Sequence, residues 1–111
     1  MKLAELEAEL LRRVEDGTYS TAPIPLAEAD GVMFLCPGCY RRNGGKVGTH
    51  SILCWFVGRI PDDVSPRPGR WVPAGNSIDD LTFVGPAAAS VQITGGCNWH
   101  GFIKNGEAID A

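Results

Sequence analysis

Two short motifs constrain this chain more than any other feature of its sequence. CPGC at residues 36–39 and CNWH at residues 97–100 each place two metal-ligating side chains three positions apart. Within one tight turn, this spacing lets both side chains reach the same ion, while backbone N–H groups of the turn face the sulfur atoms. Together the motifs supply three thiolates and one imidazole, a ligand set of structural zinc. We therefore predict one zinc ion bound by four residues: Cys36, Cys39, Cys97 and His100.

The sequence leaves other uses of the cysteines open. Four cysteines can form disulfides. However, an acidic residue, Glu5, already occurs within the first five positions, unlike in a secretory signal, and intracellular thiols are kept reduced. A redox-active pair of Cys36 and Cys39 lacks the βαβ context in which such pairs usually occur. Iron suits a lone Cys₃His set less well than zinc does. Zinc is therefore the leading interpretation, with a redox pair, iron or no metal as alternatives.

The composition indicates one globular domain. The chain has 111 residues, of which 44% are apolar and 21% are charged, and these are ordinary values for a folded domain. No apolar stretch approaches the roughly 18 residues that a membrane span requires. The net charge of −3 excludes a protein that coats nucleic acid through an overall basic surface.

The N-terminal residues are expected to form an amphipathic helix. Apolar side chains recur there at spacings of three and four residues: Leu3, Leu6, Leu10 and Val14. This spacing is typical of one helical face, and so short a helix needs a packing partner. We predict a helix over residues 3–15 within an N-terminal segment 1–16, followed by an extended linker over residues 17–30. The leucines are expected to pack on the chain's own sheet, with a second copy or another protein as the alternative.

The remainder of the chain, residues 31–111, has the pattern of short strands and turns. Apolar stretches predict strands at 32–35, 51–57, 81–84, 90–94 and 101–103, with a shorter one at 70–72. The stretch 51–57 is apolar on both faces and is expected to be central. Asn105-Gly106 predicts a hairpin turn before a returning strand at 107–109. We predict a mainly β (α+β) fold, a small antiparallel zinc-ribbon-like domain with one N-terminal helix.

Cys54 and His50 lie outside the predicted metal site. In an extended strand they are about 13 Å apart, too far to bind one ion together easily. Cys54 stands between Leu53 and Trp55 and is expected to be a small core residue. His50 precedes the strand and is the candidate catalytic residue, as a general base beside a nucleophile or a metal-bound water.

Several motifs along residues 34–107 carry a family resemblance. They are FLCPGC (34–39), GTH (48–50), LCW (53–55), PDD (61–63), PGRW (68–71), DDLT (79–82), SV (90–91), GCNWHGFI (96–103) and NGE (105–107). With these motifs the chain resembles a family of small tailed-phage and prophage proteins of unknown function, often labelled "ammonia monooxygenase". The resemblance implies a phage-encoded, zinc-binding β domain with the four ligands predicted above. The label does not fit, because ammonia oxidation of that kind belongs to a large membrane-embedded copper enzyme, and this thiolate-rich chain suits zinc better.

We expect a zinc-stabilised accessory or structural protein that acts by binding a phage or host protein, in the host cytoplasm or the virion. Four protein ligands close the coordination sphere of zinc, which favours a structural ion. One alternative is a zinc-dependent hydrolase in which water replaces one ligand and His50 is the general base. A further alternative is nucleic-acid binding through the basic segment 40–71, which has six basic and two acidic side chains, with Trp55 or Trp71 exposed for stacking.

Overall fold

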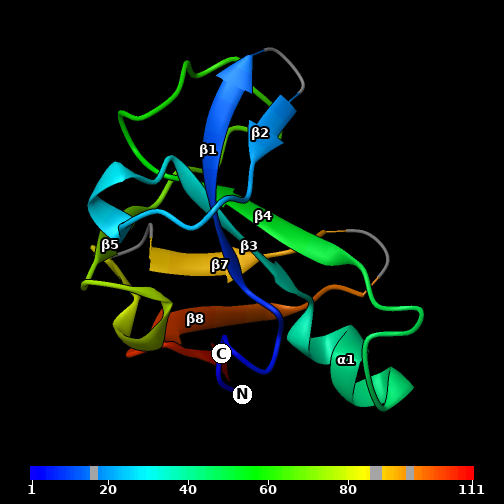
Figure 1. Cartoon of the computed structure of the whole chain (residues 1–111). Coiled ribbons are helices and arrows are strands. Elements are labelled where there is room, and N and C mark those ends of the chain that lie inside the picture. Colours follow the sequence, from blue (N-terminus) through cyan, green and yellow to red (C-terminus); the bar gives the residue numbers. More distant parts are fainter. Residues whose placement is uncertain (16–17, 86–88, 95–96) are drawn as a thin grey trace.

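The computed structural model describes residues 1–15, 18–85, 89–94 and 97–111, and these residues form mainly antiparallel β-sheet with a single α-helix. One sheet has four strands in the order β2-β1-β3-β4 (Figure 1). Its strands are β1 (Glu9–Glu15), β2 (Thr18–Ser20), β3 (Gly31–Leu35) and β4 (Ser51–Trp55). The predicted antiparallel, mainly β class is therefore confirmed.

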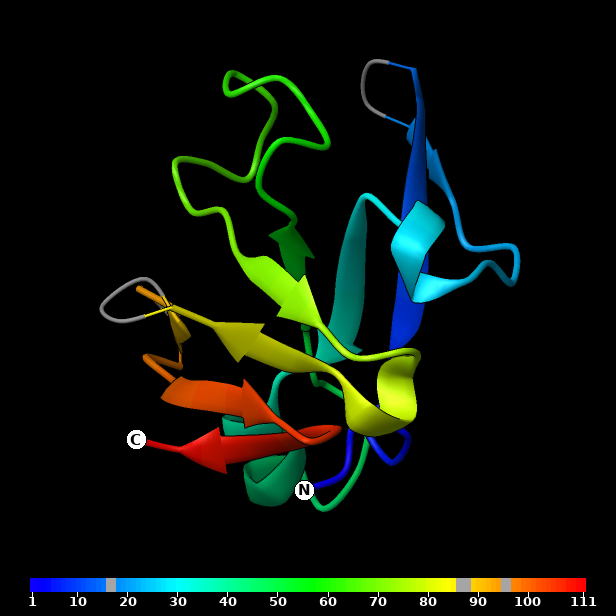
Figure 2. The same cartoon turned by 90° about the vertical axis from the view of Figure 1, so that its left-hand side faces the viewer.

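Two smaller sheets complete the fold. Their strands are β5 (Val72–Ala74), β6 (Thr82–Val84), β7 (Ser90–Gln92), β8 (His100–Lys104) and β9 (Glu107–Asp110). The orders are β5-β6 and β7-β8-β9, and β6 lies against β8 (Figure 2). The helical elements are α1 (Pro37–Asn43) and two 3₁₀ turns, η1 (Leu26–Glu28) and η2 (Ile78–Asp80).

The predicted N-terminal helix is wrong. Residues 9–15 form strand β1, which pairs with β3 in the register Leu10↔Val32, and Glu7 has a left-handed φ of 53° that no α-helix contains. Leu10 and the fully buried Leu11 enter two different hydrophobic clusters, so both faces of the strand are covered. A short isolated helix is marginal in water, and pairing with β3 satisfies the backbone while both Leu10 and Leu11 are buried.

The predicted boundary between an N-terminal segment and a β domain is also wrong. The Met1 ammonium donates to Ala108 O, the Leu3 N–H donates to Gly106 O, and the Leu35 N–H donates to Leu6 O. The first residues thus lie between β3 and β9 and form part of the same domain. The expected linker contains β2 and η1, and residues 16 and 17 lie outside the described residues.

Three further sequence predictions concern Cys54, the hairpin at residues 105–106 and strand β4. The Cys54 side chain is fully buried among the apolar residues of the main cluster, as predicted. Asn105 and Gly106 have φ values of 49° and 75° and join β8 to β9, which confirms the hairpin. Strand β4 is not central, however, because it pairs with β3 on one side and forms the edge of its sheet. The face of β4 that carries Leu53 and Trp55 packs instead against Leu11 of β1 and against Ile60 and Val64 of the loop after the strand.

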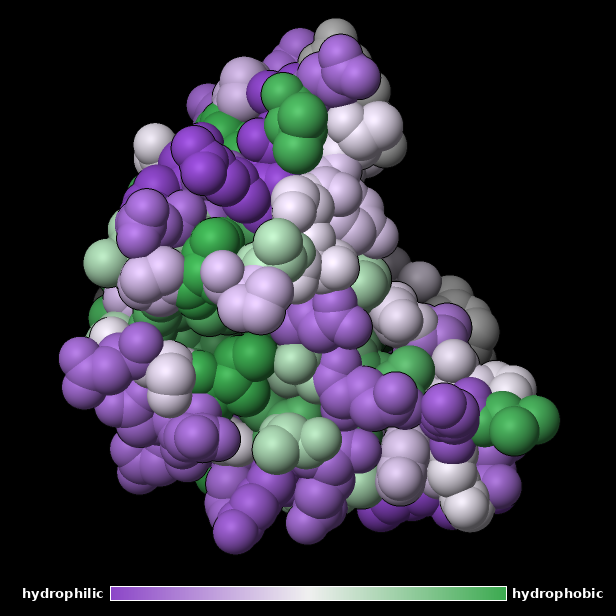
Figure 3. Space-filling model, in the orientation of Figure 1, coloured by the Kyte–Doolittle hydropathy of each residue, from purple (hydrophilic) through white to green (hydrophobic). Residues whose placement is uncertain are grey.

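The surface in the orientation of Figure 1 is mostly hydrophilic, with apolar side chains gathered near the middle of this face (Figure 3). Among the described residues, no helix has the length and apolar character needed to cross a membrane.

Candidate metal centre

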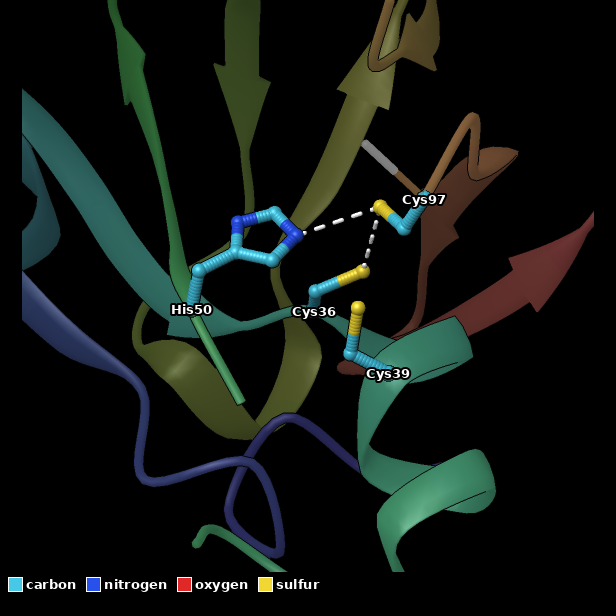
Figure 4. Close-up of side chains that lie close together, drawn as sticks. All are labelled: Cys36, Cys39, His50 and Cys97. Atoms are coloured by element: carbon cyan, nitrogen blue, oxygen red, sulfur yellow. Dashed lines mark hydrogen bonds between the residues drawn. The ribbon is translucent and has the colours of Figure 1, made fainter. Parts of the chain in front are cut away.

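Three cysteines and one histidine from distant parts of the chain converge at one point (Figure 4). Cys36 follows β3, and Cys39 lies in the first turn of α1. His50 immediately precedes β4, and Cys97 lies between β7 and β8. The ligand atoms of all four side chains lie within 4.8 Å of one another. Residues that adjoin the four-stranded and the three-stranded sheets therefore meet at the same point.

The CPGC motif opens a helix rather than forming a β-turn. Cys36 has the extended backbone of an N-cap, with φ −61° and ψ 120°, and Pro37 occupies the first helical turn, where its missing N–H costs nothing. The Tyr40 N–H donates to Cys36 O at 2.9 Å and closes the first turn. This turn brings the two thiols of the motif to the same side of the chain, as their spacing predicts.

Strand pairing brings His50 to this turn. The β3–β4 register pairs Leu35 with Ser51, and the Cys36 N–H extends it by donating to His50 O at 2.9 Å. His50 is thus the direct cross-strand neighbour of Cys36. A sequence signal for this existed, since an antiparallel pairing of the apolar stretches at 31–35 and 51–55 places residues 36 and 50 opposite one another.

The distances fit a four-coordinate metal ion. His50 Nε2 lies 3.1 Å from Cys97 Sγ, and Cys36 Sγ lies 3.3 Å from Cys97 Sγ. In a tetrahedral site with metal–sulfur bonds of about 2.3 Å, the sulfur atoms lie roughly 3.8 Å apart. The two separations above are somewhat shorter than this value, and all four ligand atoms lie within 4.8 Å of one another, so the group is compatible with one metal ion.

His100, the predicted fourth ligand, is not in this group, and the imidazole that lies beside the three thiols is that of His50. His100 lies on β8 opposite Gln92 and is exposed, and its ring is tilted by 38° to that of Phe102 with centroids 6.2 Å apart. The left-handed Asn98, with φ 52°, turns the chain between Cys97 and the strand. Side chains alternate along a strand, and here the outward position is taken by His100.

The surroundings of Cys36 and Cys97 shift the pKa values of their thiols in opposite directions. Burial raises the pKa of the Cys36 thiol to about 11; the Cys39 backbone N–H opposes this shift, and the neighbouring Cys97 adds to it. Partial burial likewise opposes ionisation of Cys97, but hydrogen bonds from the Trp99 backbone N–H and from the His50 ring outweigh it and lower its pKa to about 6. Backbone N–H groups therefore face the sulfur atoms, as expected for a thiolate site.

The His50 ring can present a lone pair to an ion. In the absence of an ion, Nε2–H can donate to the Cys97 sulfur. A proton carried on Nδ1 instead donates to the Ser51 carbonyl at 3.3 Å, and Nε2 is then a free lone pair at the centre of the group. This pairing of one ring nitrogen with a backbone carbonyl is how metal-binding histidines are usually oriented.

A second set of contacts fixes the Cys97 turn. Trp99 is 5% exposed, and its Nε1–H donates to Asp110 Oδ1 at 2.9 Å. Arg41 of α1 donates to both oxygens of Asp110, at 2.9 and 2.7 Å. Gly101 leaves room for the ring, because a Cβ there would collide with Trp99 and with the Ile109 carbonyl. These roles of Trp99, Arg41 and Asp110 were not predicted from the sequence; the glycine two positions after Trp99 is the one local signal of a close approach.

Cys54 and Trp55 are both buried in the structure. Cys54 is fully buried away from the metal group, and burial raises its thiol pKa strongly. Trp55 is only 3% exposed and donates its Nε1–H to Ser65 O, so it offers no face for stacking on a base. Several basic side chains of residues 40–71 are held by the protein itself: Arg41 by Asp110, Arg59 by Ala29 O, and Arg70 by carbonyls including Val64 O.

No family model, no curated protein and no solved structure matches this chain. The fold and the site define a small, mainly antiparallel β protein whose three thiols and one imidazole are placed to hold a metal ion.

Proposed function

We propose that this is a zinc-stabilised binding protein, in which Cys36, Cys39, His50 and Cys97 hold one structural Zn²⁺. The convergence of these four side chains within 4.8 Å carries the proposal. Soft thiolate ligands with one imidazole select zinc over the harder divalent ions. The same proposal includes a zinc-ribbon-like domain, in which two Cys-containing turns hold the ion.

The ion would contribute folding free energy. In a chain of 111 residues the hydrophobic core is modest, and a structural zinc ion adds stability because no preformed site exists in the unfolded chain. Its four ligands would come from the end of β3, the first turn of α1, the residue before β4 and the segment between β7 and β8. The ion would therefore join segments that no continuous sheet connects.

A structural ion is favoured over a hydrolytic one. Four protein ligands leave no position for a water molecule or a substrate. The hydrolase alternative requires His50 as a free general base, yet its Nε2 lies among the thiols and would be occupied by the ion. A closed site leaves the metal without a catalytic position, so we propose that the protein acts by binding. The resemblance to phage and prophage proteins makes a phage or host protein the proposed partner.

Elemental analysis and chelation test the metal role. We expect about one zinc per chain in protein purified without added metal, and a loss of sheet signal in circular dichroism when a strong chelator removes it. Restoring zinc should restore the spectrum. Protein that contains iron or no metal, or an apoprotein with an unchanged melting temperature, would contradict the proposal.

A further inference from the structure

A groove of about 510 Å³ separates the edges of two sheets. One wall is the edge of β4 at Ile52 and Leu53, and the other is the edge of β7 from Val91 onward. The candidate metal centre lies at one end of these two edges, because His50 immediately precedes β4 and Cys97 lies between β7 and β8. Trp71 closes the other end, since its backbone N–H donates to Trp55 O and its Nε1–H to Ser90 O.

The β4 wall presents unpaired backbone groups. Hydrogen-bonded and non-bonded residue pairs alternate in an antiparallel ladder. The Cys36 N–H donates to His50 O, and the register from there makes Ile52 and Cys54 bond to β3. The N–H and C=O groups of Leu53 therefore point away from β3 and have no hydrogen-bond partner among the residues that the structure describes.

The β7 wall has the same property. The Ile93 N–H donates to Trp99 O at 2.8 Å, so the register makes Val91 the residue that bonds to β8. The backbone groups of Gln92 point away from β8, toward the groove, and no described residue pairs with them. Ser90 confirms this direction, because its carbonyl accepts from the Trp71 ring on the same side.

We propose that this groove binds an extended, acidic peptide segment of a partner protein, which pairs with the sheet edges at Leu53 and Gln92. Unpaired N–H and C=O groups on facing edges are met best by another backbone in β conformation. The half-buried Trp71 ring offers an apolar contact for alternate side chains of such a segment.

The positive charge of the groove favours an acidic peptide. Arg67 is exposed and is the one charged side chain among the described residues that line the groove, and no carboxylate stands beside it there. An acidic side chain on the bound strand would face this guanidinium. The inference rests on the proposed function, because the bound ion would hold the two edges at a constant spacing.

Edge pairing uses backbone groups, so a generic alternating peptide suffices as a probe. We would titrate ¹⁵N-labelled zinc protein with the capped peptide TVEVEVT and with its lysine counterpart TVKVKVT. The acidic peptide is expected to bind more tightly and to protect the amides of Leu53 and Gln92 from hydrogen exchange. Arg67→Glu should weaken its binding by roughly tenfold or more and reverse the preference. Arg42→Glu, an equal charge change on an exposed residue of α1, should leave binding unchanged.

Gln92→Pro removes an N–H that the β7–β8 ladder does not use, and it should abolish binding while the fold is kept. Zinc content is measured on every sample, so a metal-free protein overturns the proposed function, whereas a zinc-loaded protein that binds neither peptide overturns only the groove. Binding without protection of the two amides, or binding that is unaffected by Arg67→Glu and Gln92→Pro, also overturns the groove. So does light scattering that shows the edges joining two copies of the chain.

Discussion

The Nε2 atom of His50 lies 3.1 Å from the Sγ atom of Cys97, although 47 positions separate the two residues in the chain. His50 leads into the four-stranded sheet, and Cys97 leads into the three-stranded one. An ion bound between them would connect the two sheets directly. This contact places His50, and not His100, at the candidate metal centre.

His50→Ala should lower zinc affinity by tenfold or more and lower the melting temperature, because it removes one ligand of the proposed site. His100→Ala should leave both nearly unchanged, since its exposed ring lies on the outer face of β8. Competition with a chromogenic zinc chelator measures the affinities. Equal zinc loss in the two variants, or loss in His100→Ala alone, would return His100 to the ligand set.

Cys54→Ser should leave the zinc content at the wild-type value. The thiol is fully buried in the main hydrophobic cluster, so a hydroxyl there lacks a polar partner and is expected to cost about 1–3 kcal/mol of unfolding free energy. Urea unfolding and elemental analysis of the same sample measure the two effects. A variant that loses its zinc would make Cys54 a ligand.

Leu6→Ala should reduce the unfolding free energy by about 2–5 kcal/mol, because the side chain is fully buried in the main cluster. Val14→Ala is the matched control from the same N-terminal segment, with a side chain that is 66% exposed, and it should cost little. Urea midpoints of the two variants are compared. Similar costs would show that the first residues do not belong to the core.

Gly101→Ala should destabilise the protein by about 1–3 kcal/mol through overpacking, since the added methyl group must displace the Trp99 ring or the Ile109 carbonyl. Gly38→Ala places a methyl group beside the same ring at an ordinary distance of 3.4 Å, in a helix that favours alanine, and should be tolerated. Thermal melts and tryptophan fluorescence compare the pair. A harmless Gly101→Ala would remove the proposed support for the Cys97 turn.

Asp110 should make stability depend on acid pH. Hydrogen bonds from the Trp99 ring and then from Arg41 lower the pKa of its carboxyl below 3.8 in the folded protein. Its contribution is therefore complete above the unfolded-state pKa of about 3.9 and is lost as the pH falls through the lower folded-state value. The difference in melting temperature between the wild type and Asp110→Asn should be largest near neutral pH and should shrink below pH ~4.

Zinc release in acid affects both proteins alike, so the difference between them isolates the carboxylate. A difference that is constant from pH 3 to pH 7 would mean that Asp110 acts through packing rather than charge.

The strands of the C-terminal half, the hairpin at Asn105 and Gly106, the burial of Cys54 and the pairing of Cys36 with Cys39 could all be predicted from the sequence. Each depends on neighbours within a few positions: an apolar stretch, a turn dipeptide, or the CPGC spacing. The N-terminal leucines could not be interpreted in the same way. Their spacing fits a helix, but the pairing of Leu10 with Val32 in β3 depends on residues 22 positions away and outweighs local propensity.

The fourth member of the metal centre was likewise decided by tertiary structure. The CNWH spacing favours His100 as the ligand, and no local feature of the sequence points to His50. The choice follows from the β3–β4 register, which sets His50 opposite Cys36, and from the turn at Asn98, after which His100 enters β8 on its exposed side. The sequence determined that three thiolates and an imidazole could meet. Which imidazole meets them depends on hydrogen bonds between strands, because strand register places residues that lie far apart in the chain beside one another.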